Sequence, residues 1–143
     1  MAIRKASAVW RGNLKQGKGT VALGSGAFEG NYSFGSRFEE GPGTNPEELL
    51  GAAHAGCFSM AFAHQLAEAG FEAKSVRTTA LVQLLKRDDG FAVASITLEC
   101  EAEVPKIDQE KFLQLGEQAK TGCPISKALK ATEIKLNARL VGR

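Results

Sequence analysis

The chain has 143 residues, of which 43% are hydrophobic and 24% are charged, a composition typical of a soluble globular protein with one core. A formal net charge of only +2 gives no indication of nucleic acid or another polyanion as a partner. No apolar run reaches membrane-spanning length, and the basic N-terminal segment lacks the apolar core of a signal peptide, so we expect a single cytoplasmic domain over residues 1–143 with no membrane partner.

The N-terminal third is predicted to form three short strands. Loosely alternating apolar residues indicate strands over Met1–Trp10, Gly17–Leu23 and Ala27–Phe34, separated by glycine-containing turns. The GxG sequences in these turns superficially suggest a phosphate loop, but no helix follows them, so turns are the better interpretation. Glycine and proline in Ser36–Gly43 then predict a loop, which carries Arg37.

Residues Thr44–Gly70 are predicted to form one long helix around which the rest of the chain is organised. Asn45 is suited to cap the helix, Pro46 to its first position, and Glu48 to a capping box three residues after the cap. Gly70 is suited to end the helix in a left-handed C-cap. The middle is apolar on nearly every face, which predicts that this helix is buried at the centre of the fold.

The second half of the chain is predicted to contain a hairpin, two helices and a last strand. The hairpin joins Val76–Lys86 through an Asp-Asp-Gly turn to an alternating strand that ends at Val104. Helices are expected to begin at Asp108 and at Cys123-Pro124, and the last strand covers Thr132–Leu140. The resulting order, β-β-β-α-β-β-α-α-β, predicts an α+β fold in which antiparallel sheets wrap around the long helix.

Three cysteines are available for chemistry. Their odd number, and the absence of CxxC and HExxH sequences, predict neither a disulfide framework nor a metal site. Cys100 lies on the apolar face of its strand, which favours a structural role. Cys123 begins a helix, where the dipole and free N–H groups favour the thiolate, and the alternative is an exposed surface thiol. Cys57 lies deep inside the long helix, so its position alone favours the core, and His54 one turn earlier fits a base or a core histidine about equally.

Arg37 and Glu47 flank the start of the long helix. Taken alone, Arg37 fits a solvated loop charge, and Glu47 fits an acid that stabilises the first helical turn. The sequence GTNPEELLGAAHAGCFSM, with SRFE before it and GCPIS after it, closely resembles the OsmC family, which is related to the organic hydroperoxide resistance (Ohr) proteins. The resemblance covers essentially the whole chain. The sequence around His54 resembles the OsmC branch, because Ohr proteins typically have a tyrosine at this position.

This resemblance implies a thiol-dependent peroxidase that reduces organic hydroperoxides and, more weakly, hydrogen peroxide, in defence against oxidative or osmotic stress. It implies that Cys57 is the peroxidatic cysteine, that Cys123 resolves its sulfenic acid as a disulfide, and that Arg37 holds the thiolate while Glu47 positions that arginine. The implied partners are a small-molecule hydroperoxide and a dithiol reductant, commonly a lipoylated protein system. We expect no cofactor and no metal.

The spacing of two site residues predicts a homodimer. Glu47 and Cys57 are ten residues apart, which on a continuous helix is roughly 15 Å of axial rise. One arginine can hardly bridge both groups over that distance, so we predict an intertwined dimer in which the Arg37–Glu47 pair comes from the partner subunit. Small residues on the helix permit a close helix crossing there: Gly51, Ala52, Ala55 and Gly56.

Two alternative functions remain open from the sequence. One is a non-enzymatic interaction or redox-sensing module, in which the thiols are structural or simply oxidisable. The other is a thiol–disulfide oxidoreductase that acts on protein disulfides with Cys123 as the attacking thiol, and the absence of CxxC weighs against it.

Overall fold

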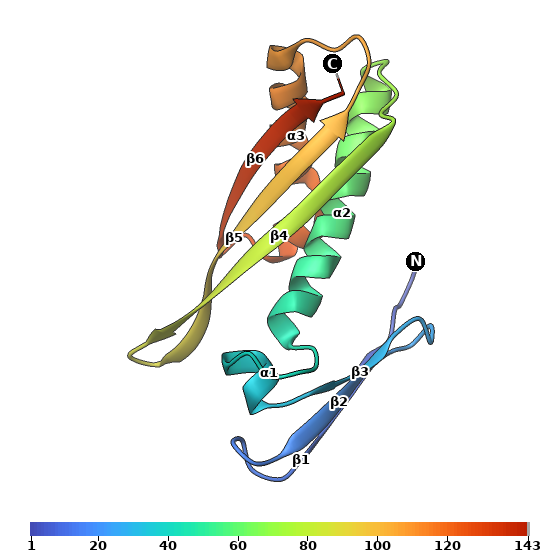
Figure 1. The fold of residues 1–143 in the computed structure, drawn as a ribbon. Coiled ribbons are helices and arrows are strands. Elements are labelled where there is room, and N and C mark those ends of the chain that lie inside the picture. Colours follow the sequence, from blue (N-terminus) through green and yellow to red (C-terminus); the bar gives the residue numbers. More distant parts are fainter. Residues whose placement is uncertain (143) are drawn as a thin grey trace. The chain divides into compact units, whose positions relative to one another are not determined.

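The computed structural model of the protein describes residues 1–142, and Arg143 lies outside the described residues. The chain divides into two compact units, Met1–Leu49 and the part from Leu50 onward, each with its own three-stranded sheet (Figure 1). We describe each unit by itself, and the assignment of residues 1–143 to a single domain stays a prediction. Within residues 1–142 no helix has the length and apolar character needed to cross a membrane.

The sheet of the first unit contains the three predicted strands, each shorter than the sequence pattern indicated. They are β1 (Ala6–Arg11), β2 (Lys18–Leu23) and β3 (Glu29–Tyr32), in the order β1-β2-β3, and both pairs are antiparallel. Gly26 has a φ of +81° in the connection between β2 and β3, a backbone conformation that glycine adopts at little cost. The predicted turn between these strands is therefore confirmed.

The segment that carries Arg37 is a helix, so the predicted loop over Ser36–Gly43 is wrong for residues 36–38 and confirmed for residues 39–43, which form neither helix nor strand. Helix α1 covers Phe34–Phe38 and is held by a reciprocal capping box between two serines. The Ser36 N–H donates to Ser33 Oγ at 3.1 Å, and the Ser33 N–H donates to Ser36 Oγ at 2.8 Å. The usual capping box has glutamate or glutamine in the second position, so a serine pair followed by glycine and proline predicts a loop rather than a helix.

Helix α2 (Pro46–Glu68) is the predicted long helix, and most of its expected end signals are confirmed. Asn45 Oδ1 accepts a hydrogen bond from the Glu48 N–H at 2.8 Å, as an N-cap does. The Glu48 carboxylate accepts from Thr44 Oγ1 at 2.6 Å, a contact that differs from the predicted capping box. At the other end Gly70 has a φ of +90°, which is the expected left-handed C-cap.

The second sheet has the order β4-β5-β6. Strands β4 (Ser75–Arg87) and β5 (Gly90–Glu103) form the predicted antiparallel hairpin. Strand β6 (Glu133–Val141) pairs with β5 in parallel, so the prediction of antiparallel sheets is wrong at this position. The connection from β5 to β6 contains α3 (Gln109–Gly122) and α4 (Pro124–Ala128). A crossover of this kind brings the chain back to the end of the sheet at which β5 begins, so that β6 can run parallel to β5.

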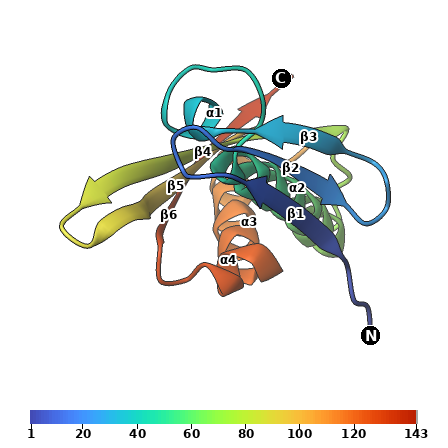
Figure 2. The same cartoon turned by 90° about the horizontal axis from the view of Figure 1, so that it is seen from below.

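The core of this unit lies between the second sheet and the helices α2 and α3, which cover the same face of that sheet (Figures 1 and 2). The alternation predicted for β5 is confirmed, because every second residue from Ile96 to Ala102 is buried. The central aromatic rings stack in a tilted series, with Phe58 and Phe62 5.6 Å apart and Phe62 and Phe112 5.2 Å apart between centroids. Apolar burial of this extent is the main stabilising contribution to such a unit.

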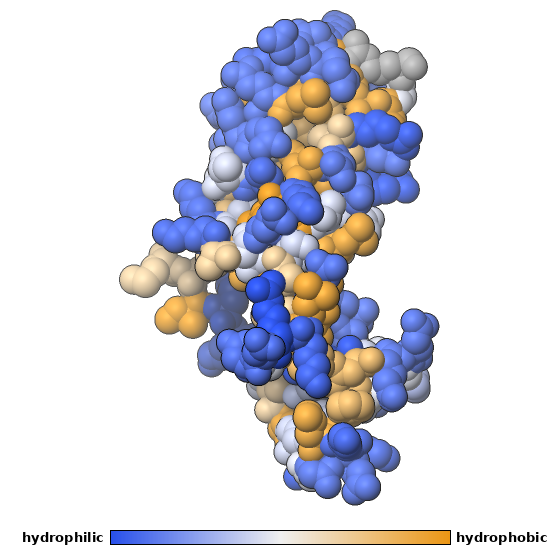
Figure 3. Space-filling model, turned by 90° about the vertical axis from the view of Figure 1, so that its left-hand side faces the viewer, coloured by the Kyte–Doolittle hydropathy of each residue, from blue (hydrophilic) through white to orange (hydrophobic). Residues whose placement is uncertain are grey.

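The predicted burial of α2 is confirmed for one stripe of the helix only. This stripe contains Gly51, His54, Phe58, Phe62 and Leu66. Met60 is 77% exposed, and the small residues Ala52, Ala53 and Gly56 are also exposed. Apolar side chains of other elements are also exposed: Leu81, Leu85 and Phe91. On the face drawn in Figure 3, hydrophobic patches lie among hydrophilic side chains. An apolar helix face that the chain itself leaves uncovered is a feature of subunit interfaces.

Candidate active site

The site begins with two thiols that α2 and α4 bring into contact. Cys57 lies in the middle of α2, and Cys123 lies at the junction of α3 and α4. The Cys123 thiol donates to Cys57 Sγ at a sulfur–sulfur distance of 2.8 Å, and both cysteines are free. Cys57 is partly exposed and Cys123 is fully buried. The short distance between the two sulfur atoms suits the formation of a disulfide between them.

Cys123 is placed by the two helices that meet at it. Its N–H donates to Ala119 O at 3.0 Å and closes α3, while Pro124 begins α4 directly afterwards. The alternative of an exposed surface thiol is therefore wrong. The free N–H groups at this helix start were expected to act on Cys123, but the Ile125 N–H donates to Cys57 instead. The start of α4 thus contributes to the environment of the other thiol.

The surroundings of Cys57 hold its pKa above the ordinary value of a thiol. Burial is the largest cause, followed by the hydrogen bond from the Cys123 thiol, while the Ile125 N–H acts in the opposite direction. None of the causes of the shift is a cation of the unit that begins at Leu50. A nucleophilic thiol needs the thiolate, so the unit by itself holds Cys57 in its less reactive form.

His54 lies one turn before Cys57 and contacts the other helix of the site. Its Nε2 and Ser126 Oγ are 2.8 Å apart, and both residues are buried. Burial lowers the pKa of His54, so the ring is neutral at pH 7. No hydrogen bond between His54 and either thiol is found in residues 1–142, and this contact favours a structural role for His54 over the base role considered from the sequence.

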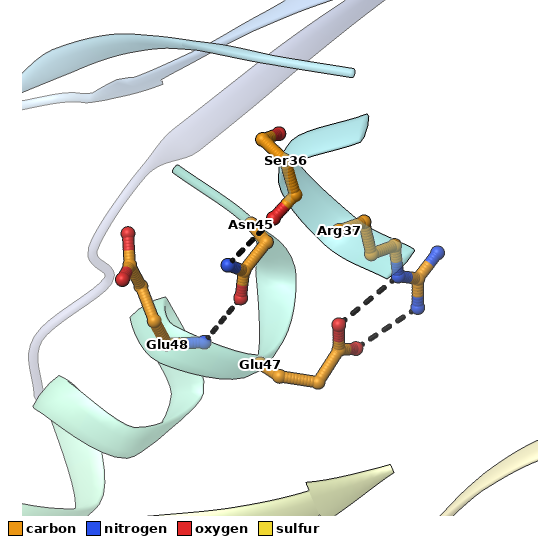
Figure 4. Close-up of polar contacts among 5 residues, drawn as sticks. All are labelled: Ser36, Arg37, Asn45, Glu47 and Glu48. Atoms are coloured by element: carbon orange, nitrogen blue, oxygen red, sulfur yellow. Dashed lines mark hydrogen bonds and ion pairs between the residues drawn. The ribbon is translucent and has the colours of Figure 1, made fainter. Parts of the chain in front are cut away.

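Arg37 and Glu47 form a bidentate ion pair in the first unit. The Arg37 Nε–H donates to Glu47 Oε1 at 3.0 Å, and Nη2–H donates to Glu47 Oε2 at 2.9 Å (Figure 4). This fork geometry fixes the plane of the guanidinium and uses one of its edges. Nη1 takes no part in the pair, and 35% of the Arg37 side chain is exposed, so the guanidinium keeps donors for a third group.

Hydrogen bonds of the loop between α1 and α2 fix the positions of Arg37 and Glu47 relative to each other. Asn45 Nδ2 donates to the Ser36 carbonyl at 3.1 Å while its Oδ1 caps α2, so one side chain joins the end of α1 to the start of α2 (Figure 4). Ser36 Oγ also donates to the Thr44 carbonyl at 2.6 Å. The Arg37 guanidinium lies 5.2 Å from the Phe38 ring centroid, which adds a cation–π contact.

The four predicted site residues therefore form two pairs, Cys57 with Cys123 and Arg37 with Glu47. Sequence reasoning missed Ser126 and Ile125, although both lie in the GCPIS sequence on which the resemblance was based. The signal for Ser126 was its spacing, since it follows Cys123 by three residues as Cys57 follows His54. Cys100 is 2% exposed and belongs to the core, which confirms its structural assignment.

Comparison with known proteins places the chain in a family. The sequence model of the OsmC family, described as OsmC-like protein, matches residues 39–138. The chain belongs to the OsmC family. It is 51% identical over 138 residues to Peroxiredoxin OsmC of Escherichia coli, an alignment that covers 96% of each protein.

More distant members share the sequence pattern and the fold of this OsmC-family chain. Organic hydroperoxide resistance protein OhrB of Bacillus subtilis is 35% identical over 100 residues, which are 68% of this chain and 71% of OhrB. The crystal structure of an organic hydroperoxide resistance protein OsmC from Legionella pneumophila superimposes with a TM-score of 0.74 at 25% identity, and covers 97% of this chain and 99% of that one. The predicted resemblance to the OsmC family, and the α+β fold that it implied, are confirmed.

Proposed function

We propose that this protein reduces organic hydroperoxides, and more weakly hydrogen peroxide, with Cys57 as the peroxidatic thiol and Cys123 as the resolving thiol. The general class of activity follows from the family: the chain is a cysteine-based peroxidase, since it is half identical to a peroxiredoxin over nearly its full length. The observation that supports these residue roles is the 2.8 Å contact between the two sulfur atoms.

The proposed first step is attack of the Cys57 thiolate on the O–O bond of the peroxide. The thiolate sulfur takes the terminal oxygen and becomes sulfenic acid, and the alkoxide leaves and is protonated to the alcohol. Met60, an exposed apolar side chain three residues after Cys57 on α2, favours an organic over an inorganic peroxide.

The second step joins the two sulfur atoms. The Cys123 sulfur attacks Cys57 Sγ, the S–S bond forms as the S–O bond breaks, and the hydroxide leaves as water with the thiol proton. A dithiol then reduces the disulfide by two exchange steps and is itself oxidised to a cyclic disulfide. We propose that this reductant is a lipoylated protein system, and that the reaction takes place in the cytoplasm.

The thiolate of the first step requires a cation, and we propose that Arg37 of the partner subunit in a homodimer supplies it. The raised pKa of Cys57 is one argument, because no cation of its own unit opposes the effect of burial. The ten residues between Glu47 and Cys57 on the uninterrupted helix α2 are another, since they correspond to roughly 15 Å of rise. The exposed apolar face of α2, with Met60 and its small neighbours, is suited to a second copy of the chain.

Peroxide consumption by cysteine variants tests this function. With cumene hydroperoxide and dihydrolipoamide we expect wild-type turnover, no activity in Cys57→Ser, and a single turnover in Cys123→Ser that ends at the sulfenic acid. Cys100→Ser is the matched control, because this thiol is a buried core residue with no proposed role in the reaction, and it should keep wild-type turnover in the folded protein. Full activity of Cys57→Ser would contradict the assignment.

The same assay separates the proposal from the two alternatives. In a redox-sensing module, peroxide would oxidise Cys57 once, and no reductant would support continued peroxide consumption. A protein thiol–disulfide oxidoreductase would reduce a disulfide-bonded protein substrate and lose that activity in Cys123→Ser. The complete burial of Cys123 weighs against the oxidoreductase, since an attacking thiol has to reach its substrate. Replacing dihydrolipoamide by thioredoxin tests the proposed reductant.

A further inference from the structure

Two side-chain contacts join α2 to α4, and they follow the same spacing on both helices. Cys57 contacts Cys123, and His54, three residues before Cys57, contacts Ser126, three residues after Cys123. Both contacts measure 2.8 Å between the facing atoms. His54, Ser126 and Cys123 are all buried, so solvent does not compete for the histidine–serine hydrogen bond.

The protonation state of His54 follows from its surroundings. Burial lowers its pKa, so the ring is neutral and carries one N–H. Nδ1 is buried and has no hydrogen-bond partner in residues 1–142. The assignment that leaves no buried N–H without an acceptor puts the proton on Nε2, which then donates to Ser126 Oγ. The hydrogen bond therefore has a defined direction, from the long helix to the short one.

Helix α4 depends on contacts of this kind because it has only five residues. A single turn cannot maintain its own conformation in water, so its position is set by what it touches. Its first residues supply two groups of the proposed reaction: Cys123 is the N-cap residue of α4, and the Ile125 N–H donates to Cys57. A rotation of this turn would move the Cys123 sulfur away from Cys57 and remove the Ile125 donor.

We propose that His54 is a positioning residue for the resolving step, in which it holds Ser126, and with it α4, so that Cys123 attacks the Cys57 sulfenic acid. The inference rests on the proposed function, since it concerns the second step of that reaction. In this step the Cys123 sulfur supplies the electron pair of the S–S bond, and the Cys57 sulfur is reduced as its oxygen leaves as water. Within residues 1–142 His54 forms no hydrogen bond with either reacting sulfur, and in this proposal it transfers no proton.

The inference predicts that loss of the hydrogen bond separates the two steps. In Ser126→Ala, the first-order rate of disulfide formation after oxidation should fall about tenfold, the effect of losing one buried hydrogen bond at the transition state. The second-order rate of Cys57 oxidation by cumene hydroperoxide should change by less than about twofold. Cys123 does not react in that step, and the two contacts of α4 with Cys57 act on its pKa in opposite directions, since the Cys123 thiol raises it and the Ile125 N–H lowers it. The long-lived sulfenic acid should be trapped by dimedone and, with excess peroxide, oxidised further to sulfinic acid.

Quenched-flow mass spectrometry on the full chain measures both rates in one experiment. Ser126→Thr keeps the hydroxyl and should resolve at close to the wild-type rate, and His54→Gln, which keeps an N–H donor, should retain more of the rate than His54→Leu. Ser59→Ala is the matched control, because it removes a similar side-chain hydrogen bond of α2, the 2.7 Å contact with Thr78 Oγ1, away from α4. Circular dichroism and a thermal melt identify any variant that fails to fold.

Each result separates this inference from the function on which it rests. Slow resolution with normal oxidation in Ser126→Ala, and normal kinetics in Ser59→Ala, would support it. Normal resolution in folded Ser126→Ala, or an equal loss of both rates, would overturn the positioning role while leaving the peroxidase intact. A wild-type protein that forms no sulfenic acid with peroxide would overturn the proposed function itself, together with the inference.

Discussion

The two units of the chain hold their reactive groups in opposite ways. In the unit from Met1 to Leu49, the Arg37–Glu47 pair remains accessible, with 35% and 14% of the two side chains exposed. In the other unit the thiols are buried or partly buried, and the pKa of Cys57 is raised. The first unit contains a fixed cation with unused donors and no cysteine at all. The second contains every cysteine, without a cation that lowers the Cys57 pKa.

We infer from this difference that, with the proposed residue roles, neither unit by itself is a complete peroxidase site. A buried thiol needs a positive charge to ionise, and a bidentate arginine held by a carboxylate is suited to supply that charge with fixed geometry. The two halves lie on a chain whose helix α2 separates Glu47 from Cys57 by ten residues. We therefore propose that they meet across a dimer interface, and the following experiments test how far each unit depends on the other.

Removal of the cation should have the largest effect. In Arg37→Met the pKa of Cys57 should rise in the assembled protein, because an opposite charge close to a group shifts its pKa by about one to three units. The thiolate fraction at pH 7, and with it the second-order rate of Cys57 oxidation, should fall about 10- to 1000-fold. The rate should recover as the pH is raised, since the thiol then ionises without the arginine.

The pH profile of Cys57 alkylation by iodoacetamide measures this shift. Arg139→Met is the matched control, because Arg139 also forms an ion pair with a glutamate, Glu101, but on the exposed part of the second sheet. An unchanged profile in Arg37→Met, or an equal shift in Arg139→Met, would show that Arg37 has no special influence on the thiol.

Removal of the carboxylate should have a smaller effect. In Glu47→Gln the guanidinium stays charged but loses the bidentate partner that fixes its plane, so the rate of Cys57 oxidation should fall about tenfold. Stopped-flow kinetics with cumene hydroperoxide measure it. Glu48→Gln is the control for a lost charge in the first turn of α2, since Glu48 contacts Thr44 rather than Arg37. Equal losses in the two variants would assign the effect to the helix terminus instead of the ion pair.

The buried histidine should produce the smallest effect, a pH dependence of stability. The pKa of His54 is lowered in the folded state, so below about pH 6.5 the unfolded chain takes up a proton that the folded chain does not. The free energy of unfolding should therefore fall as the pH is lowered from there, with a slope of at most about 1.4 kcal/mol per pH unit for one proton. His54→Gln should flatten the slope in urea denaturation, whereas His64→Gln, at an exposed position of the same helix, should leave it unchanged.

The sequence predicted the long helix and its ends because capping residues act locally. Asn45 accepts a hydrogen bond from an N–H group of the first helical turn, and Gly70 adopts the left-handed conformation that ends the helix. Both effects involve only neighbouring residues and do not depend on the rest of the fold. The same locality explains the failure at α1, where a serine pair replaced the usual capping sequence. The parallel pairing of β6 depends on the end of the sheet to which α3 and α4 bring the chain back, and no local sequence pattern predicts that end. The roles of Cys57 and Cys123 came from resemblance, but their contact and the hydrogen bond between His54 and Ser126 needed the structure, since more than 60 residues separate each pair.

Subunit complementation tests the shared site most directly. Cys57→Ser lacks the thiol and Arg37→Met lacks the cation, so each homodimer should be inactive or nearly so. If the arginine comes from the partner, unfolding and refolding an equal mixture should produce mixed dimers with one intact site, and restore about a quarter of wild-type activity. If both groups act within one chain, every site in the mixture lacks one of them, and the mixture would stay as inactive as the separate variants.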